Sequence, residues 1–459
     1  MGVTAIPQKY YQHWKDFIEK APPGHKFGPF FNIWGREWEI PKEGKVQVLK
    51  DVCALGPDAV ELLNKLLDRQ KQVAQLCGED IFSISGKSSS PFMTGVGMEH
   101  PLEIGFAFLN PYGIPYLPGA SVKGVIRKAA EDLALGFYGD QTDGWSILDV
   151  WWMFGFESES AYLTGKAPIE IDILRNIACD LKNAYRNFVQ AADPQYLNDL
   201  VVPFIKNMLS DEKLKKQFEE QPKKFLQELA NTENKNLRDA VHNRGALTFW
   251  DVFPQTEKLE VDILTPHYID YYEGKNEGKT SPADCGQPKP NSFLTVPPSS
   301  EFNFNIQYNG ASLPDRLRAR WKVLVQAAFE ISFTLVGFGA KTSVGYGRIN
   351  FPAGHSFGVK KYSEVGSPDK LDQIQKAAPN PIIPDPIIWG NAFLSYAINT
   401  GEITASVGNK KAISKDKSIV PESLLAKLRA KKKKPVTARV EVEPYGNSFR
   451  LLKIFEENK

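Results

Sequence analysis

Apolar positions in the first third of the chain predict a helix, a strand and a second helix, in that order. Helical spacing of apolar residues predicts the first helix over about 57–77. Strict alternation of apolar with small or charged residues predicts a strand over 101–108. Helical spacing returns from Val122 to Leu133, and Ser121 stands where a capping residue would. A strand is therefore expected to lead, through a turn rich in Pro and Gly, into an amphipathic helix.

The rest of the chain changes character twice. Leu, Lys, Glu, Gln and Asn dominate residues 167–242, where Pro194 and Pro222 separate what we expect to be several short helices. After this segment, strand patterns return, and an amphipathic helix again lies between two of them. The expected strands cover 247–253, 259–263, 302–308 and 345–351, the helix covers 317–329, and the polar stretch 273–292 is expected to be a surface loop.

Two strand–helix–strand halves with period-two strands predict an α+β fold with a ferredoxin-like core. Beyond the core, a proline-rich segment precedes two strand-like runs, at about 392–406 and 436–455. The expected domains are an N-terminal helical appendage (1–80), the ferredoxin-like core (81–166 and 243–360), a helical insertion (167–242), a linker (361–386) and a small basic β domain (387–459).

The overall charge identifies no partner, because 56 Lys and Arg residues against 54 Asp and Glu residues give a net charge of only +2. Positive charge is concentrated in residues 410–434, which include the run Lys431, Lys432, Lys433 and Lys434. Such a run is either a solvated surface or a track for a phosphate backbone, and the sequence leaves both open.

The cysteines and the hydropathy pattern indicate a soluble protein of a reducing cytoplasm. Cys53, Cys77, Cys179 and Cys285 form no CxxC pair, so we expect buried, reduced thiols and no zinc ribbon. No segment approaches the ~18 consecutive apolar residues of a membrane span, and the first residues lack the pattern of a signal peptide. We expect no membrane contact, no bound metal and no cofactor.

The segment 337–348 carries four glycines, with Lys341, Thr342 and Ser343 at its centre. Glycine lets backbone amides approach a phosphate closely, and the lysine and hydroxyls add charge and donors. The segment fits neither the Walker pattern nor GxGxxG, which disfavours a nucleotide-dependent enzyme. A tight turn after a helix would account for one or two of the glycines, so anion contact is the favoured interpretation.

A second candidate site lies at the start of the helix that follows residue 118. Lys123 and Arg127 are four residues apart, near a helix N-terminus whose unpaired amides attract anions. A solvated helix face is the alternative. Since cations oppose the helix dipole at this end, a bound phosphate would explain them.

His100 lies between Glu99 and Glu103 and is a candidate general base. No second His or Cys lies near it in sequence to form a catalytic dyad or a metal site. A structural role near a strand start is therefore the favoured interpretation.

The ordered set of motifs resembles the RAMP superfamily of CRISPR RNA-binding proteins. The motifs are 113–127, then Phe154 with Gly155, then 337–348. Further blocks, at 94–105, 249–254, 259–268, 271–272 and 293–296, resemble the family of sixth Cmr subunits of type III-B effector complexes. The matching blocks lie within 81–351.

This resemblance implies a RAMP/RRM-like core in a noncatalytic RNA-binding structural subunit of a multisubunit antiviral complex. The subunit would contact the 3′ region of crRNA, target RNA and adjacent Cmr-type RAMP subunits, and would have no small-molecule substrate. An alternative is a metal-independent RAMP endoribonuclease that processes CRISPR RNA with His100 as general base. Ala120 stands where a second Ser is common in the family, so one hydroxyl contact is missing. The residues expected to face RNA are Gly119, Ser121, Lys123, Arg127, Gly337, Gly339, Lys341, Thr342, Ser343, Gly345, Gly347 and Arg348, with His100 and Lys431 to Lys434 as secondary candidates.

Overall fold

The chain forms two compact units, Met1–Ser356 and Phe357–Lys459. A computed structural model describes residues 3–35, 37–41, 44–138, 144–167, 172–265, 290–310, 313–351, 387–397, 402–407, 410–414, 420, 436–445 and 448–455. The predicted linker 361–386 and residues 273–289 of the predicted surface loop lie outside these residues, whereas the last two residues of that predicted loop, Asn291 and Ser292, belong to a strand.

The first unit contains a four-stranded antiparallel sheet with the ferredoxin-like topology. Its strands, in spatial order, are β4 (Leu247–Phe249), β7 (Glu301–Tyr308), β1 (Ile81–Ser88) and β8 (Ile349–Asn350). Helix α5 (Gly119–Ala134) lies between β1 and β4 in the chain, and α16 (Trp321–Ile331) lies between β7 and β8. The chain order βαββαβ, with the two outer strands contributed by the second and fourth, is the split βαβ arrangement. The predicted fold class is confirmed.

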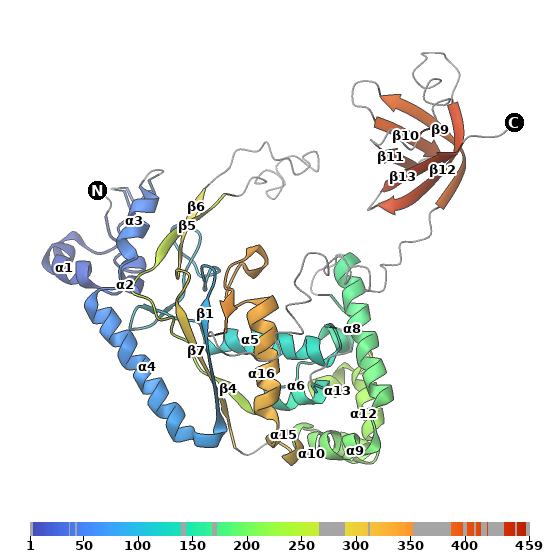
Figure 1. The fold of residues 1–459 in the computed structure, drawn as a ribbon, viewed down its shortest axis with the longest axis horizontal. Coiled ribbons are helices and arrows are strands. Elements are labelled where there is room, and N and C mark those ends of the chain that lie inside the picture. The colour runs from blue at the N-terminus through green and yellow to red at the C-terminus, as the bar shows by residue number, and fades with distance from the viewer. Residues whose placement is uncertain are drawn as a thin grey trace. The chain divides into compact units, whose positions relative to one another are not determined.

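The period-two pattern of β7 explains how this sheet is covered. Phe302, Phe304 and Ile306 are fully buried on one face of the strand. The Phe304 ring lies 5.3 Å from the ring of Phe329 in α16. Helices α5 and α16 both lie on this face of the sheet, and the long helix α4 (Pro57–Cys77) lies on the other (Figure 1). The predicted helix over 57–77 is confirmed.

The strand expected over 101–108 is wrong. Only Phe108–Leu109 (β2) is a strand there, paired with Ile114–Pro115 (β3). Glu103 adopts a left-handed backbone (φ 71°), and its amide donates to the carbonyl of His100, which closes a turn where a strand would need extended backbone. The first strand of the core is β1, whose alternation is too weak to stand out in the sequence.

The strand expected over 345–351 is shorter than predicted. Gly345 and Gly347 have φ values of 100° and 69°, which only glycine adopts readily and which extended strands exclude. Residues 342–344 form a 3₁₀ turn (η4), and pairing with β1 involves only Ile349–Asn350. The glycine-rich segment is therefore a folded turn that ends in a short edge strand.

The helical insertion predicted after residue 167 is present. Pro194 and Pro222 occupy the first turns of α9 and α12, where proline's missing amide donor costs nothing. The insertion packs on α6 through a cluster of buried rings that includes Trp151, Tyr185 and Phe204. Helices α6 (Ile147–Phe154) and α7 (Ala161–Thr164) precede the insertion, whose elements are α8 (Asp172–Ala191), α9 (Pro194–Tyr196), the π-turn η2 (Leu197–Val201), α10 (Val202–Met208), α11 (Glu212–Glu219), α12 (Pro222–Leu229) and α13 (Lys235–Asp239).

The remaining elements of the first unit surround the core. The N-terminal helices precede α4, and a two-stranded hairpin lies between β4 and β7 in the chain. Their bounds are α1 (Gln8–Lys20), α2 (Pro23–Phe27), α3 (Lys45–Val52), η1 (Gly78–Asp80), β5 (Glu260–Leu264), β6 (Asn291–Thr295), α15 (Asp315–Arg318) and the π-turn η3 (Ser332–Val336), which directly follows α16.

The second unit is a closed five-stranded barrel, where the sequence predicted two strand-like runs. Its interior is filled by small and branched apolar side chains, among them Ile403, Ala405, Val440 and Ile454. The strands are β9 (Ile387–Ala397), β10 (Glu402–Val407), β11 (Lys410–Ser414), β12 (Val436–Tyr445) and β13 (Ser448–Phe455).

The cysteines are less buried than expected. Cys179 is exposed, while Cys53 and Cys77 are half-buried, and all three are free thiols. Burial raises the pKa of the Cys53 thiol to about 11, which disfavours its reactive thiolate form. Cys285 lies outside the described residues. None of the helices that the structure describes has the length and apolarity needed to span a bilayer.

Candidate functional site

The start of α5 is built around Gly119. A Cβ atom at this position would overlap the carbonyl oxygen of Phe249, so only glycine allows α5 to pack this closely against the end of β4. The N-cap residue is Pro118, and no side chain caps the helix from that position. The expectation that Ser121 caps α5 is wrong, because Ser121 lies inside the first turn, where its side chain is exposed.

The anion at this helix N-terminus comes from the protein itself. The Gly119 amide donates to Oδ1 of Asp251 at 2.8 Å, and the carbonyl of Asp251 accepts from Nε2 of Gln70 in α4. The negative carboxylate therefore occupies the position where the sequence predicted a phosphate. Asp251 has the structural hydrogen-bonding role that buried or half-buried carboxylates commonly have.

Arg127 is neutralised inside the protein. Its Nε donates to Oε1 of Glu131 at 2.9 Å. Its Nη2 lies 3.3 Å from Oε2 of Glu157, which is close enough for an ion pair, although the two atoms are not aligned for a hydrogen bond. Only 17% of the Arg127 side chain is exposed. This geometry does not present Arg127 to a ligand and corrects the role that the motif suggested.

Lys123 lies beside a cation that the sequence patterns did not single out. Its Nζ donates to the carbonyl of Arg244 at 3.2 Å, and the Arg244 side chain is exposed. Burial, and then the charges of Arg127 and Arg244, lower the pKa of Lys123. Within the described residues, neither Lys123 nor Arg244 forms an ion pair with a carboxylate. We refer to Lys123 and Arg244 as the cationic pair.

Gly124 lies one residue beyond Lys123 on the exposed side of α5. A Cβ atom there would meet no neighbour within 4 Å, so packing does not require glycine. Glycine in a helix costs roughly 0.5–1 kcal/mol relative to alanine. An open glycine beside two cations leaves room for a bulky group to approach the helix backbone.

The glycine-rich segment uses most of its amides internally. The amide of Ala340 donates to the carbonyl of Met93, that of Gly347 to the carbonyl of Pro91, and that of Phe338 to the carbonyl of Gly347. A Cβ atom on Gly339 or Gly347 would overlap a carbonyl oxygen in this network. The amides that donate to oxygens of the protein belong to Gly337, Phe338, Ala340, Val344, Gly345, Tyr346, Gly347 and Arg348. The expected amide cradle is therefore not free to bind an anion through these groups.

Side chains at the tip of the same segment remain accessible. Lys341 adopts a left-handed backbone (φ 58°), which turns the chain at this position. Lys341 and Thr342 are half-exposed, and Ser343 is exposed. Arg348 differs, because its Nη1 donates to the carbonyls of Thr334 and Leu335 and so closes the end of the π-turn after α16.

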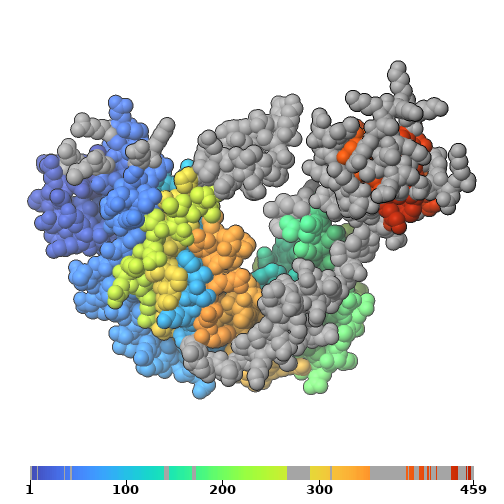
Figure 2. Space-filling view, turned by 45° about the horizontal axis from the view of Figure 1, so that its top comes forward, coloured from blue at the N-terminus to red at the C-terminus, as the bar shows by residue number. Residues whose placement is uncertain are grey.

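The tip is attached to the hairpin β5–β6. The Tyr346 hydroxyl donates to Oδ2 of Asp262 at 2.7 Å, and burial, followed by this hydrogen bond, raises the pKa of Tyr346 to about 12. Figure 2 shows the orange surface of residues 313–351 beside the yellow-green surface of β5. Asp262 therefore has a structural role, as expected for a carboxylate beside aromatic residues.

His100 is held as a neutral structural residue. Its Nδ1 accepts a hydrogen bond from the Leu102 amide at 3.2 Å, so Nε2 carries the proton and donates to the carbonyl of Phe27 at 3.0 Å. The imidazole stacks on the Phe27 ring, with centroids 3.7 Å apart. Burial lowers the pKa of His100 to about 4. Both nitrogens are in use, which fits the structural interpretation and does not fit a general base.

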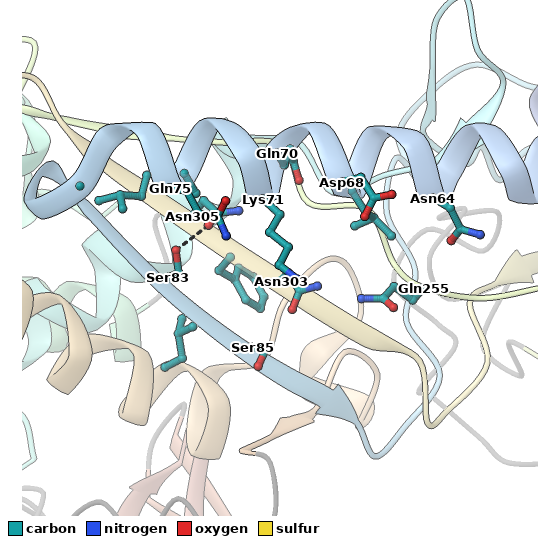
Figure 3. A pocket seen from close by; sticks show the side chains of 16 residues that line it. Asn64, Asp68, Gln70, Lys71, Gln75, Ser83, Ser85, Gln255, Asn303 and Asn305 are labelled. Carbon is teal, nitrogen blue, oxygen red and sulfur yellow. Dashed lines mark hydrogen bonds between the residues drawn. The ribbon is translucent and has the colours of Figure 1, made fainter.

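A wide cleft lies on the polar face of the core sheet, where the sequence indicated no site. It has a volume of about 990 Å³ and lies between α4 and strands β1 and β7. Ser83 and Asn305 face each other across the strands and are joined by a 2.7 Å hydrogen bond, and Lys71 reaches in from α4 (Figure 3). RNA-recognition motifs stack bases on aromatic residues of the two central strands. The corresponding positions here are Ser83, Ser85, Asn303 and Asn305, so this face lacks that stacking platform at those positions.

The profile of the RAMP superfamily matches residues 87–350. The chain belongs to the RAMP superfamily. The match includes the core strands β4, β7 and β8, helix α5, the insertion and the glycine-rich segment, and it ends before the barrel unit.

One curated RAMP relative is the CRISPR system Cmr subunit Cmr6 of Pyrococcus furiosus, 26% identical over 280 residues, which are 59% of this chain and 68% of the relative. Similar solved structures include the type III-B Cmr-beta complex bound to cognate target RNA (TM-score 0.35, 17% identity, 67% of this chain and 69% of that chain). The crystal structure of Cmr6 from Pyrococcus furiosus has a TM-score of 0.27 at 23% identity, with 60% of this chain and 98% of that chain covered.

The geometry separates the RAMP motif residues into two groups. Arg127, Arg348 and His100 serve the protein's own packing, as do the buried glycines. Lys431 to Lys434 lie outside the described residues. The accessible polar groups that remain are Ser121, Lys123 and Arg244 at the start of α5, and Lys341, Thr342 and Ser343 at the tip of the glycine-rich segment.

Proposed function

We propose that this chain is an RNA-binding structural subunit of a type III-B CRISPR RNA-guided complex. In that role it contacts the 3′ region of crRNA or the target RNA, together with adjacent RAMP subunits, in antiviral defence. The observation that carries the proposal is the cationic pair, which lies at the α5 motif inside the region that the RAMP profile matches. The identity with Cmr6 supports the particular complex.

The geometry supports recognition of the RNA backbone by side chains. Lys123 and Arg244 supply charge without a carboxylate partner among the described residues, and the helix surface at Gly124, next to Lys123 in the chain, is open. Phosphate contacts of this kind fix position and orientation but carry no base sequence. A subunit of an RNA-guided complex needs only such contacts, because pairing between guide and target reads the sequence.

The two parts of the proposed surface are joined by packing. Helix α5 contacts α16 and η3, and η3 runs directly into the glycine-rich segment. Both elements therefore lie on the helical side of the sheet (Figure 1). The proposed surface runs from the start of α5 to the tip at Lys341, Thr342 and Ser343.

A co-purification experiment tests the assignment. Tagged full-length protein from its native host is expected to bring down short CRISPR-derived RNAs and other Cmr-type RAMP subunits. Cross-linking before lysis is expected to join RNA to peptides that contain Lys123 or Lys341. Recovery of the protein alone, without RNA or RAMP subunits, would overturn the proposal.

The endoribonuclease alternative has a direct test as well. Because both nitrogens of His100 bind backbone groups, we expect no cleavage of labelled guide precursor by the purified protein in EDTA. Cleavage that is lost on His100→Ala would favour the enzyme instead.

A further inference from the structure

The barrel unit has the strand topology of an OB-fold. Its hydrogen-bonded order is β9-β10-β11-β13-β12, closed by pairing of β12 with β9. All neighbouring pairs are antiparallel except β11 with β13, which is parallel. A five-stranded Greek-key barrel with this order is an OB-fold, and the outer face of its second and third strands is a common site for oligonucleotides or oligosaccharides. Topology alone does not establish a function, so the residues on this face must support one.

A row of side chains crosses the outer face of the first three barrel strands. Phe393 of β9 is the direct partner of Ser406 in β10, and Ser406 is the direct partner of Lys411 in β11. The strand spacing of about 4.8 Å places Phe393 and Lys411 roughly 10 Å apart. Ser395 and Thr404 form the next pair along the same two strands. We refer to Phe393, Ser395, Thr404, Ser406 and Lys411 as the strand face.

Phe393 is not needed for the barrel core. The inward positions on both sides of it, Ala392 and Leu394, are buried, whereas Phe393 points outward and is 54% exposed. Phe393 therefore leaves more than half of its surface exposed and has no part in the barrel core. Its flat face is, however, what an unpaired base needs for stacking.

The charge around the strand face favours a polyanion. Lys411 is exposed at one end, and Arg439 of β12, also exposed, lies next to the strand that carries Phe393. Arg439 also lies over the ring of Phe455, at 5.6 Å. Hydroxyl, aromatic and cationic groups together suit single-stranded RNA better than an uncharged sugar chain.

We propose that the strand face of the barrel is a second RNA-binding site, which takes single-stranded RNA with one base stacked on Phe393 and a neighbouring phosphate near Lys411. The hydroxyl groups of Ser395 and Thr404 provide hydrogen bonds to ribose or base edges, whereas the Ser406 hydroxyl donates to the carbonyl of Phe393 at 3.4 Å and helps to fix the strand that carries the ring. The site lies outside the residues matched by the RAMP profile and is independent of the cationic pair. The choice of RNA as the nucleic acid rests on the proposed function.

Photocross-linking of the full-length protein tests this site. The probe is an unstructured 12-nucleotide RNA that carries 5-iodouridine, which couples to stacked aromatic rings, and the cross-linked peptides are identified by mass spectrometry. We expect the peptide that contains Phe393 to be cross-linked. Binding of the same RNA, measured in a variant with Lys123→Ala and Arg244→Ala, is expected to weaken by roughly five- to a hundredfold on adding Phe393→Ala, the range for loss of one stacked base.

Two control variants separate stacking from folding. Phe393→Trp keeps a stacking ring and is expected to retain the affinity for RNA. Lys453→Ala removes an exposed cation of β13, opposite Glu441 of β12, and is expected to change the affinity less than twofold. Unchanged affinity in Phe393→Ala, or cross-links confined to residues before 357, would overturn the barrel site and leave the proposed function standing. Cross-links at Phe393 together with normal affinity in the Lys123→Ala and Arg244→Ala variant would support the barrel site and count against the cationic pair.

Discussion

The carboxylate of Asp251 accepts the amide hydrogen of Gly119, 132 residues earlier in the chain. This one contact fixes the start of α5 against the segment after β4 and satisfies a helix N-terminus that would otherwise attract an external anion. The nearby cations Lys123 and Arg244 are left without a carboxylate of their own among the described residues. RNA phosphate is thus expected to meet side chains, while the helix end serves the fold.

Replacing Asp251 is expected to destabilise the protein. Asp251→Ala removes the acceptor for the Gly119 amide, and loss of a helix-capping side chain costs about 1–2 kcal/mol of the free energy of unfolding. Chemical denaturation measures this difference. Asp251→Asn keeps an acceptor and is expected to lose less; equal stability of Asp251→Ala and the native protein would show that the contact does not stabilise α5.

Two glycines of α5 are expected to respond in opposite directions to alanine. Gly124→Ala fills open space and should raise the free energy of unfolding by roughly 0.5–1 kcal/mol, because alanine favours helix. Gly119→Ala should lower it, since its Cβ would overlap the Phe249 carbonyl. We also expect Gly124→Ala to weaken RNA binding, which fluorescence anisotropy would detect. A more stable variant with unchanged RNA affinity would exclude close approach of RNA at Gly124.

Acid is expected to destabilise the first unit through His100. The pKa of His100 is about 4 in the folded protein and about 6.5 in the unfolded chain, so the unfolded chain binds more protons between these values. The His100 contribution is therefore fully present above pH 6.5 and is lost as the pH falls toward 4. Denaturation curves of the native protein and His100→Gln across this range test the expectation: the variant should show the weaker pH dependence, and identical profiles would contradict it.

The Tyr346 hydroxyl is expected to hold the tip of the glycine-rich segment against β5. Tyr346→Phe removes its 2.7 Å hydrogen bond to Asp262, which should cost about 0.5–1.5 kcal/mol. Hydrogen exchange of the amides from 342 to 346, followed by mass spectrometry, should become faster in the variant. Unchanged exchange would mean that the turn is held by its backbone hydrogen bonds alone.

The sequence predicted the core well where the hydrophobic pattern is set by burial on one face. Alternation in β7 and helical spacing in α5 and α16 predicted these three core elements, whereas the first core strand, β1, was missed. The pattern over 101–108 misled because alternation in the sequence does not ensure alternating burial: Gly105, Phe106 and Ala107 are all buried, and Glu103 adopts a left-handed backbone. Four of the barrel strands were merged into two predicted runs, and β11 was missed because it lies in the basic stretch between those runs.

The candidate site was harder to predict, because sequence patterns do not show which polar groups are already paired. Arg127 and Lys123 stand one turn apart with the same chemistry, but only Arg127 meets carboxylates, one of them from a distant loop. Arg244 belongs to no local motif and reaches the site only because the chain returns to α5 through β4. The sequence held one indication of this site, because Asn243 and Gly245 on either side of Arg244 form a tight turn after the insertion. That Lys123 contacts this turn could not be predicted from the sequence.

The salt dependence of RNA affinity is the most direct test of the central claim, that accessible cations on α5 and the glycine-rich segment bind the RNA backbone. Each lost phosphate contact should reduce the slope of log affinity against log salt concentration by roughly 1. We expect a reduction of about 1 for each of Lys123→Ala, Arg244→Ala and Lys341→Ala, and a much smaller effect for Arg348→Ala, whose guanidinium binds backbone carbonyls. A slope that stays unchanged in the triple variant of Lys123, Arg244 and Lys341 would contradict the account.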